Sequence, residues 1–328
     1  MSDRIGAVDF SKGMLVLFMV VYHSLNCLGH ESLPHYYLLF VPPSFILITG
    51  FIVTHVYVPR YGTATREIVS RLTLRSVKLV TLFTLMNVGA GLVFSGRRGG
   101  AVTGLSDFVG NWVDVYVMGG SRWAAFEVLL PIGYLLCLSI PVLWLQARVP
   151  AATAWVTAAV IAACLAAERF GYPVYNLYLI GAGLLGMAVG LVPDAGMKAA
   201  IGRWGPPLAF YALYWLAFLL LGDRYGVQLV ATLASVALVY TAGSRIDLHR
   251  WMPVQVLILG RYSLLAYIVQ IFYLQLFKRS PLYGDFGATG AVAVILLAAV
   301  LTWATVRVLD RVRGDHALVD RAYRLIFA

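Results

Sequence analysis

Charged side chains are scarce in this sequence. Only 12% of its 328 residues are Asp, Glu, Lys or Arg, whereas 61% are hydrophobic and the mean hydropathy is +0.82. Soluble globular domains carry about 25% charged residues. The composition therefore excludes an ordinary soluble protein and indicates an integral membrane protein. At about 20 residues per span, the chain has room for roughly ten helices with short loops and for no separate soluble domain.

Cysteine and acidic residues are also few. Cys27, Cys137 and Cys164 lie in apolar runs without the spacing of metal ligands, so we expect buried thiols, no disulfides and no metal site. The 15 acidic residues face 25 basic ones, which gives a formal net charge of +10. Because the basic residues cluster at the ends of apolar runs, this excess indicates membrane topology and anionic lipid as a partner, and no nucleic acid.

Apolar segments predict an all-α protein with about ten transmembrane helices, forming one polytopic domain over residues 1–328. The first segment is too long for a signal-peptide core and lacks an A-x-A-like cleavage site, so we expect it to remain as a span. An even number of spans places both termini on the same side, and most of the 25 basic residues fall there, which predicts cytoplasmic termini. The expected spans are 8–28, 37–58, 76–95, 125–146, 151–168, 174–192, 206–221, 226–243, 255–277 and 287–308.

The tail at 315–328 has a different character from these spans. Leu318, Ala322 and Leu325 fall on one helical face, and charged residues fall elsewhere. We therefore expect a helix lying along the inner membrane interface.

The stretch Asp9–Asn26 reads D-F-S-K-G-M-L-V-L-F-M-V-V-Y-H-S-L-N. On an α-helix, Lys12 and His23 are about 16 Å apart along the axis and only about 20° apart around it. They therefore share a face, with Asn26 close to it. With Lys12 at the inner edge of the hydrocarbon, His23 would lie near the midplane, where an ionisable group costs about 2.5–3.5 kcal/mol. We interpret His23 as the centre of a site. The plainer alternative is a neutral histidine bonded to a neighbouring helix.

Two further features of the early chain are expected to be structural. Pro42 and Pro43 should loosen the second span near its outer third. His55 falls near the inner end of that span, where an interfacial or capping position is the better interpretation. Among the later spans, Gly181, Gly186 and Gly190 predict close helix contacts without any chemistry.

A basic stripe leads into the third span. Arg71, Arg75 and Lys78 recur at spacings that place them on one helical face. Positive-inside anchoring would explain about half of these charges. A clamp for a cytoplasmic polyanion is the functional alternative, because Arg and Lys suit phosphates.

Polar side chains also mark an outer loop and the ninth span. The loop at about 96–124 contains Trp123, and Glu127 follows at the start of the fourth span, where pairing with Arg122 is its plain explanation. In the ninth span, Ser263, Tyr267 and Gln270 share one face. Buried polar groups in lipid need partners, so we expect this face to point inward, toward His23.

Several of these segments together resemble the acyltransferase type 3 membrane family. The segment with Lys12 and His23 resembles its first-helix signature, and F-I-L-I-T-G-F from Phe45 resembles its second helix. The basic segment from Arg75 and the segment from Gly260 match further family motifs. Weaker similarities extend to glucan succinyltransferases and heparan-glucosaminide acetyltransferase. The resemblance covers about a third of the chain. Gln270 stands where many members carry a second histidine, which puts a role for that position in doubt.

The resemblance implies a membrane enzyme that takes an acyl group from cytoplasmic acyl-CoA, with acetyl-CoA the expected donor. The acyl group passes to a hydroxyl or amine of a carbohydrate or glycolipid outside the inner membrane of a bacterium. In this interpretation His23 is the general base or the acyl carrier, and no metal takes part. Acyl-CoA would meet the basic residues Lys12, Arg71, Arg75 and Lys78, and the acceptor would meet Asn26, Trp123, Glu127, Ser263, Tyr267 and Gln270.

Two other classes of function compete with this interpretation. A proton-coupled secondary transporter would use His23 as a relay and should show paired interrupted helices. A membrane scaffold would have no chemistry at all. The sequence leaves open the acceptor, the acyl length, the choice between direct transfer and an acyl-histidine, and the oligomeric state.

Overall fold

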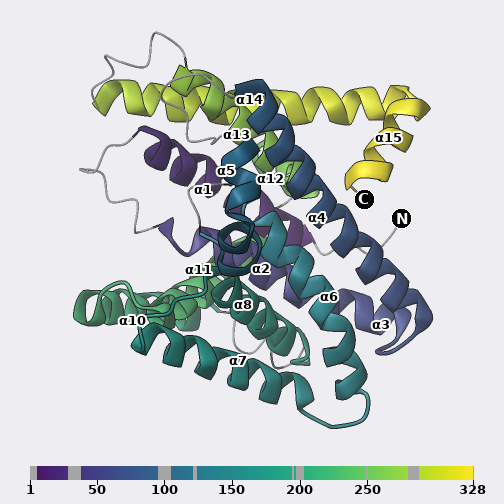
Figure 1. Cartoon of the computed structure of the whole chain (residues 1–328), viewed down its shortest axis with the longest axis vertical. Coiled ribbons are helices and arrows are strands. Elements are labelled where there is room, and N and C mark those ends of the chain that lie inside the picture. The colour runs from purple at the N-terminus through teal and green to yellow at the C-terminus, as the bar shows by residue number, and fades with distance from the viewer. Residues whose placement is uncertain are drawn as a thin grey trace. The chain divides into compact units, whose positions relative to one another are not determined.

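The structure is a computed structural model of the whole chain, and it describes residues 6–28, 38–94, 105–120, 124–193, 196, 203–247, 250–279 and 288–327. Every regular element within these ranges is a helix, as the sequence predicts (Figure 1). The first part of the chain contains α1 (Gly6–Leu28), α2 (Val41–Ile52), η2 (Val53–Tyr57), α3 (Val58–Tyr61), α4 (Arg66–Phe94), α5 (Leu105–Gly110) and η3 (Asp114–Met118). The later part contains α6 (Leu129–Gln146), α7 (Ala152–Arg169), α8 (Tyr175–Gly190), α10 (Gly205–Leu221), α11 (Tyr225–Arg245), α12 (Trp251–Arg261), α13 (Ser263–Arg279), α14 (Ala288–Asp315) and α15 (Ala317–Phe327).

The apolar helices make this a multi-pass membrane protein. In the described part of the chain, 6 helices are long and apolar enough to cross a membrane, or 7 spans if α12 and α13 count as one. Helices also occupy the other expected segments, but α8 and α10 are short for a span. The expectation of ten spans and of cytoplasmic termini therefore stays a prediction.

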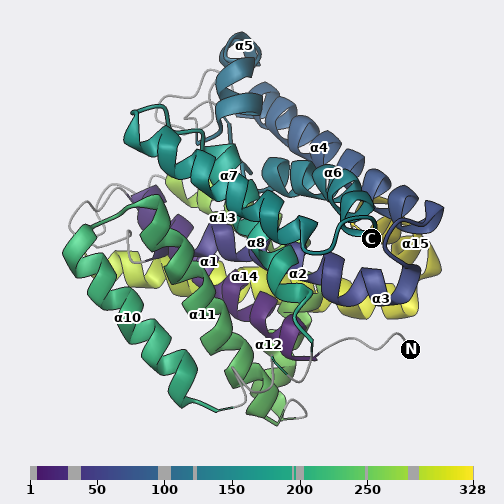
Figure 2. The same ribbon diagram turned by 90° about the horizontal axis from the view of Figure 1, so that it is seen from below.

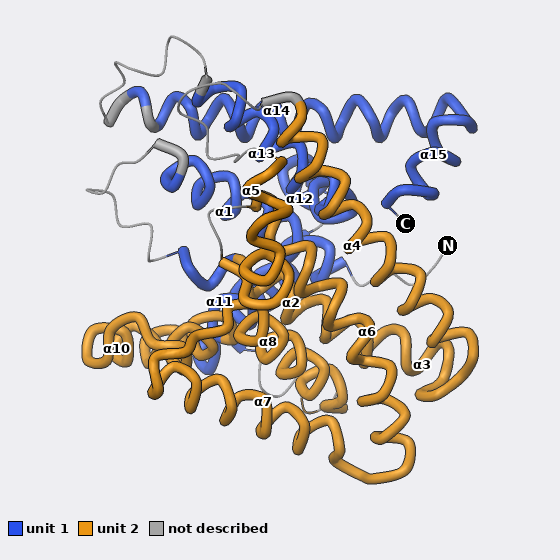
Figure 3. Tube along the Cα trace, viewed as in Figure 1, with its two compact units in different colours: residues 1–41, 203–209, 234–328 blue, residues 42–202, 210–233 orange. Residues whose placement is uncertain are grey.

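The chain divides into two compact units, coloured separately in Figure 3. Unit 1 comprises 1–41, 203–209 and 234–328, and unit 2 comprises 42–202 and 210–233. Each unit is described by itself below.

In unit 1, α1 packs against α12, α13 and α14. Two glycines permit the closest of these approaches. A side chain at Gly13 would meet the backbone carbonyl of Val256, and one at Gly260 would meet the backbone carbonyl of Asp9. Gly260, the first residue of the G-R-Y-S segment, is therefore a point at which α12 contacts α1.

The expected ninth span is not one straight helix. It consists of α12 and α13, which meet at an angle of 88°. Tyr262 lies between them, as the last residue before α13 begins at Ser263. Gly260 and Arg261 directly precede this point, but a single Gly in an apolar run is also compatible with a continuous helix, so one straight span is the expectation there.

In unit 2, α8 packs against η2 and α6 through glycine contacts, and α7 runs alongside α8 (Figure 2). A side chain at Gly186 would meet the backbone carbonyl of Leu47, and one at Gly190 would meet the hydroxyl of Thr54. Gly181 faces the hydroxyl of Tyr225 in the same way. The predicted role of these three glycines in close contact is confirmed.

Two expectations about unit 2 are wrong. Pro42 and Pro43 do not loosen a helix, because α2 begins at Val41 and the prolines occupy its first turn, where a missing N–H costs no helical hydrogen bond. The irregular segment lies later, in the π-helical turn η2, which contains His55. Cys137 is an exposed thiol, whereas Cys164 is buried as expected.

Candidate functional site

The candidate site in unit 1 begins with the polar end of α1. Lys12 Nζ lies 3.1 Å from the carboxylate of Asp9, and the two side chains are only 22% and 10% exposed. Asp9 is one helical turn before Lys12, so this ion pair forms within the helix itself. The carboxylate balances the charge of Lys12, and the role of Lys12 in binding acyl-CoA stays a prediction.

His23 lies farther along α1, in the last third of the helix. The helix bounds place it beyond the helix centre, so the midplane depth expected from the sequence stays a prediction. Its ring centroid is 5.2 Å from that of Tyr22 and 6.0 Å from that of Tyr267 on α13. The predicted approach of the Ser263–Gln270 face toward His23 is thus found at Tyr267.

An apolar cluster fixes the register of three helices at this point. Val20 of α1, Leu274 of α13 and Ala298 of α14 are buried against one another. The pairs His23–Tyr267 and Val20–Leu274 show that α1 and α13 run antiparallel. Tyr262 bonds Asp310 near the other end of α13, so α13 is antiparallel to α14 as well.

One turn from this apolar cluster, each helix carries a buried polar side chain. Ser24 follows Val20 by four residues, Gln270 precedes Leu274 by four, and Thr302 follows Ala298 by four. Given the antiparallel directions, all three steps lead to the same side of the cluster. Ser24 and Gln270 are 0% exposed, and Thr302 is 1% exposed. We call His23, Ser24, Gln270 and Thr302 the polar layer.

The polar layer consists of groups that lack hydrogen-bond partners. Buried atoms with no partner among the described residues include His23 Nε2, the hydroxyls of Ser24 and Thr302, and both amide atoms of Gln270. An unpaired buried polar group costs about 1–3 kcal/mol. Five such atoms on three packed helices therefore indicate a place built to bind water or a polar ligand.

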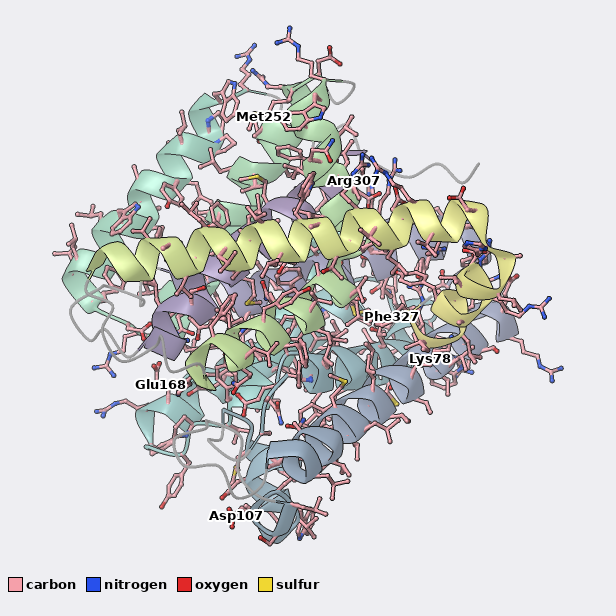
Figure 4. The ribbon with its side chains drawn as sticks, turned by 90° about the horizontal axis from the view of Figure 1, so that it is seen from above. Lys78, Asp107, Glu168, Met252, Arg307 and Phe327 are labelled. Carbon is pink, nitrogen blue, oxygen red and sulfur yellow. The ribbon has the colours of Figure 1, made fainter. Side chains whose placement is uncertain are left out.

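The basic stripe lies in unit 2 and is engaged locally. Arg71 is paired with Glu67 at 2.9 Å, and its guanidinium lies 4.4 Å from the ring centroid of Tyr61. Arg75 donates to the hydroxyl of Tyr57 in η2. Both arginines are exposed and Lys78, labelled in Figure 4, is half-buried. These contacts attach α4 to the segment around η2, and they leave the arginines at the surface.

The segment that leads into α6 is held by Asn87. Its amide accepts from the backbone N–H of Ala125 at 2.7 Å and donates to the backbone carbonyl of the same residue at 2.9 Å. The next residue, Phe126, has φ of 60°, a left-handed conformation that is strained for an aromatic side chain. Glu127 follows with a buried Oε1. The two bonds of Asn87 therefore fix the backbone just before Glu127, two residues ahead of the start of α6.

The structure brings together only part of the predicted site. His23, Tyr267 and Gln270 lie in one packed region of unit 1, with Ser263 half-buried at the start of α13. Asn26 is exposed, so its predicted place beside His23 on a shared inner face is not found. Arg71, Arg75, Lys78 and Glu127 belong to unit 2, and Trp123 lies outside the described residues together with Arg122.

Sequence reasoning missed Ser24 and Thr302. Each is a single hydroxyl in an apolar run. Ser and Thr at such positions commonly donate to a backbone carbonyl of their own helix, one turn earlier, so the sequence pattern does not mark them as part of a site. Ser11, for example, donates to Ala7 at 2.8 Å. Only the neighbouring helices distinguish a site from this local bond.

Within the described residues, no group of three or more His, Cys, Asp or Glu side chains gathers as metal ligands. Comparisons of the chain with protein-family models, curated proteins and solved structures find no match. The interpretation of the site therefore rests on its chemistry and on the sequence motifs described above.

Proposed function

We propose that this protein is a membrane acyltransferase whose reaction takes place at the polar layer. The observation that carries the proposal is the set of buried, unpaired polar atoms around His23. A histidine with a buried, unpartnered Nε2 can accept a proton or an acyl group, as general base or as nucleophile. The amide and hydroxyls beside it can hold the oxygens of a donor and an acceptor.

The chemistry of direct transfer is as follows. His23 Nε2 takes the proton of an acceptor hydroxyl or amine as the acceptor attacks the thioester carbonyl carbon. The carbon–sulfur bond breaks, and the departing thiolate of CoA takes the proton back from the imidazolium. In the alternative, Nε2 itself attacks the thioester carbonyl carbon, and the carbon–sulfur bond breaks to release CoA thiolate. The acceptor hydroxyl or amine then attacks the acyl-imidazole, the Nε2–carbon bond breaks, and the acceptor's proton passes to the thiolate. Gln270 Nε2–H and the hydroxyls of Ser24 and Thr302 are donors suited to the oxyanion that forms in either route.

The proposed donor is acetyl-CoA at the cytoplasmic face, and the proposed acceptor is a glycan or glycolipid on the other side. Acyl-CoA is a polyanion, and the exposed arginines Arg71 and Arg75 with Lys78 have the charge that it requires. The inner membrane of a bacterium is the proposed location. The lipid bilayer and the carbohydrate acceptor are the proposed partners.

A proton-coupled transporter is the second candidate, and one observation favours it. The 88° break between α12 and α13 interrupts a membrane-spanning pair, as the discontinuous helices of secondary transporters do. Such breaks occur in pairs in transporters, and one bent pair is found among the described helices.

The purified full-length protein in lipid vesicles distinguishes the two classes. Labelled acetyl-CoA should be consumed and should yield free CoA together with an acylated sugar acceptor. Uptake of solute driven by a pH gradient, without acyl transfer or acetyl-CoA hydrolysis, would overturn the enzyme proposal and support the transporter.

A further inference from the structure

The C-terminal helix α15 has two apolar faces. The first comprises Val319, Tyr323 and Phe327, which are half-buried. The second is exposed to the surroundings: Leu318 is 79% and Leu325 is 73% exposed. A helix whose outward face exposes large apolar side chains needs a further contact to cover them.

The buried face is attached to the end of α14 by charge. Asp320 accepts from Arg313 Nε at 3.0 Å and from Arg313 Nη2 at 2.5 Å, and both side chains are largely shielded from solvent. The same guanidinium lies 3.9 Å from the ring centroid of Tyr323. Figure 4 shows α15 turning back from the end of α14, with Phe327 at its end.

This attachment reaches the break between α12 and α13. Arg313 Nη1 donates to the hydroxyl of Tyr262 at 2.9 Å, and that hydroxyl donates to Asp310 at 2.7 Å. Tyr262 is the residue between the two helices, and its ring packs against that of Tyr323 at 5.2 Å. A continuous set of contacts therefore joins α15 to the bend, and we call Tyr262, Arg313, Asp320 and Tyr323 the clasp.

The exposed face of α15 has the composition of a membrane-surface helix. Helical spacing places Leu318 and Leu325 on the same face, two turns apart, and places Arg321 and Arg324 along one flank of that face. Arg324 is 70% exposed although it contacts Asp320. Apolar side chains beside arginines match the boundary between acyl chains and anionic headgroups.

The position of α15 also favours lipid over a second protein chain. The preceding membrane-spanning segment ends at Asp315, and only His316 separates it from the first residue of α15. A helix that starts at the end of a span begins at the membrane surface. Its exposed apolar side chains are therefore within reach of lipid without any further domain.

We propose that α15 binds an anionic lipid surface through Leu318, Leu325, Arg321 and Arg324, and that this binding stabilises the bend at Tyr262 through the clasp. Asp320 is shared between Arg313 and Arg324, at 2.5 Å from each. A lipid phosphate that pairs with Arg324 leaves Asp320 to Arg313 alone. Anionic lipid therefore tightens the clasp, and neutral lipid does so less. The proposal does not depend on the enzymatic activity.

The test uses the full-length protein in lipid discs, with Cys27, Cys137 and Cys164 replaced by alanine. One disc contains phosphatidylcholine alone, and the other contains equal parts of phosphatidylcholine and phosphatidylglycerol. A spin label at Leu325→Cys reports contact with acyl chains. A label at Ala317→Cys, on the charged flank of the same helix, is the matched control.

We expect phosphatidylglycerol to raise the oxygen accessibility of the Leu325→Cys label and to lower its accessibility to an aqueous nickel chelate. The Ala317→Cys label should stay accessible to the chelate. Arg321→Gln with Arg324→Gln should reduce the effect at Leu325→Cys. Equal water exposure of that label in both discs would overturn the lipid-binding surface. Broadening between labels on two chains would assign the face to a second copy instead.

The link to the bend needs a second readout. Met252 on α12 is 72% exposed and accepts a second label as Met252→Cys. The distribution of distances between the labels at Met252→Cys and Leu325→Cys should narrow in the anionic disc. Asp320→Asn should broaden it in both discs. A distribution that is the same in both discs and unaffected by Asp320→Asn would overturn the clasp.

Discussion

Several buried hydroxyls of unit 2 and the polar layer of unit 1 have opposite surroundings. In unit 2, Thr54 donates across helices to the backbone carbonyl of Met187 at 2.8 Å, and Ser76 donates to that of Gly133 at 2.8 Å. Thr157 likewise donates to the backbone carbonyl of Leu184 at 3.1 Å. In unit 1, the polar layer makes no such bonds among the described residues. The paired hydroxyls of unit 2 hold neighbouring helices together, whereas the unpaired groups of the polar layer are available to bind a ligand.

The packing explains the difference. Thr54 reaches Met187 because Gly190 brings η2 and α8 together at the backbone. In unit 1, Val20, Leu274 and Ala298 pack through apolar side chains one turn from the polar layer, and the hydroxyls of Ser24 and Thr302 have no partner among the described residues. Isolated unpaired atoms occur elsewhere, at Thr153, Tyr178 and Ser235, on three separate helices. Among the described residues, the polar layer gathers several of them in one place.

Replacing the two membrane histidines should produce the largest contrast. His23→Gln keeps a hydrogen-bonding side chain but cannot accept a proton near neutral pH. We expect it to lower turnover by about 10²–10⁴. His55→Gln is the matched control in unit 2, where the histidine ring stacks on Phe51 at 4.6 Å, and it should leave turnover close to wild type. Acyl transfer by the purified variants is the measurement. A His23→Gln protein with more than about a tenth of wild-type activity would contradict a catalytic role.

Glycine substitutions probe the packing of unit 2. Gly186→Leu places a side chain against the backbone of Leu47, so we expect a loss of about 1–3 kcal/mol or more in stability. Gly89→Ala is the control, since no atom lies within 4 Å of a side chain added there. Thermal unfolding in detergent, followed by gel filtration, compares the two. Equal midpoints for both variants would contradict the close contact at Gly186.

The basic stripe should affect binding more than chemistry. We expect Arg75→Ala and Lys78→Ala each to raise the KM for acyl-CoA about tenfold with little change in kcat, because lost phosphate contacts weaken ground-state and transition-state binding alike. Tyr57→Phe removes the local partner of Arg75 while keeping the arginine. If Tyr57→Phe raised KM as much as Arg75→Ala, or if a direct CoA titration gave equal affinities, the stripe would have a structural role only.

The smallest effect is expected from a change of pH on the attachment of α15 through Asp320. Hydrogen bonds from Arg313 and then Arg324 hold the pKa of Asp320 below its ordinary value of 3.8. Because the pKa is lowered in the folded state, the contribution of Asp320 is fully present above that value and is lost as the pH falls through the lowered pKa. The mobility of a label at Leu325→Cys should therefore stay constant from neutral pH to about pH 5 and rise only below 3.8. Release of α15 between pH 7 and 5 would assign its attachment to a group other than Asp320.

The sequence predicts the helices better than the site. Runs of apolar residues locate all the long helices, and small residues such as Gly186 and Gly190 identify the close contacts, because both signals are local. The bend at Tyr262 is not predicted, although Gly260 and Arg261 interrupt the apolar run just before it, because the contacts that fix it come from Arg313 and Tyr323, far away in the chain. His23 is detectable because an ionisable side chain in an apolar run is costly.

The stability of two matched variants tests the polar layer most directly. Gln270→Met removes an unpaired buried amide at nearly constant volume, whereas Thr54→Val removes a paired hydroxyl from unit 2. The measurement is the free energy of unfolding of the full-length protein in mixed micelles, together with acyl transfer. We predict that Gln270→Met is as stable as wild type or more stable by up to about 1–3 kcal/mol and loses activity, while Thr54→Val is less stable by about 1 kcal/mol and stays active. Destabilisation of Gln270→Met with activity retained would contradict a binding site at the polar layer.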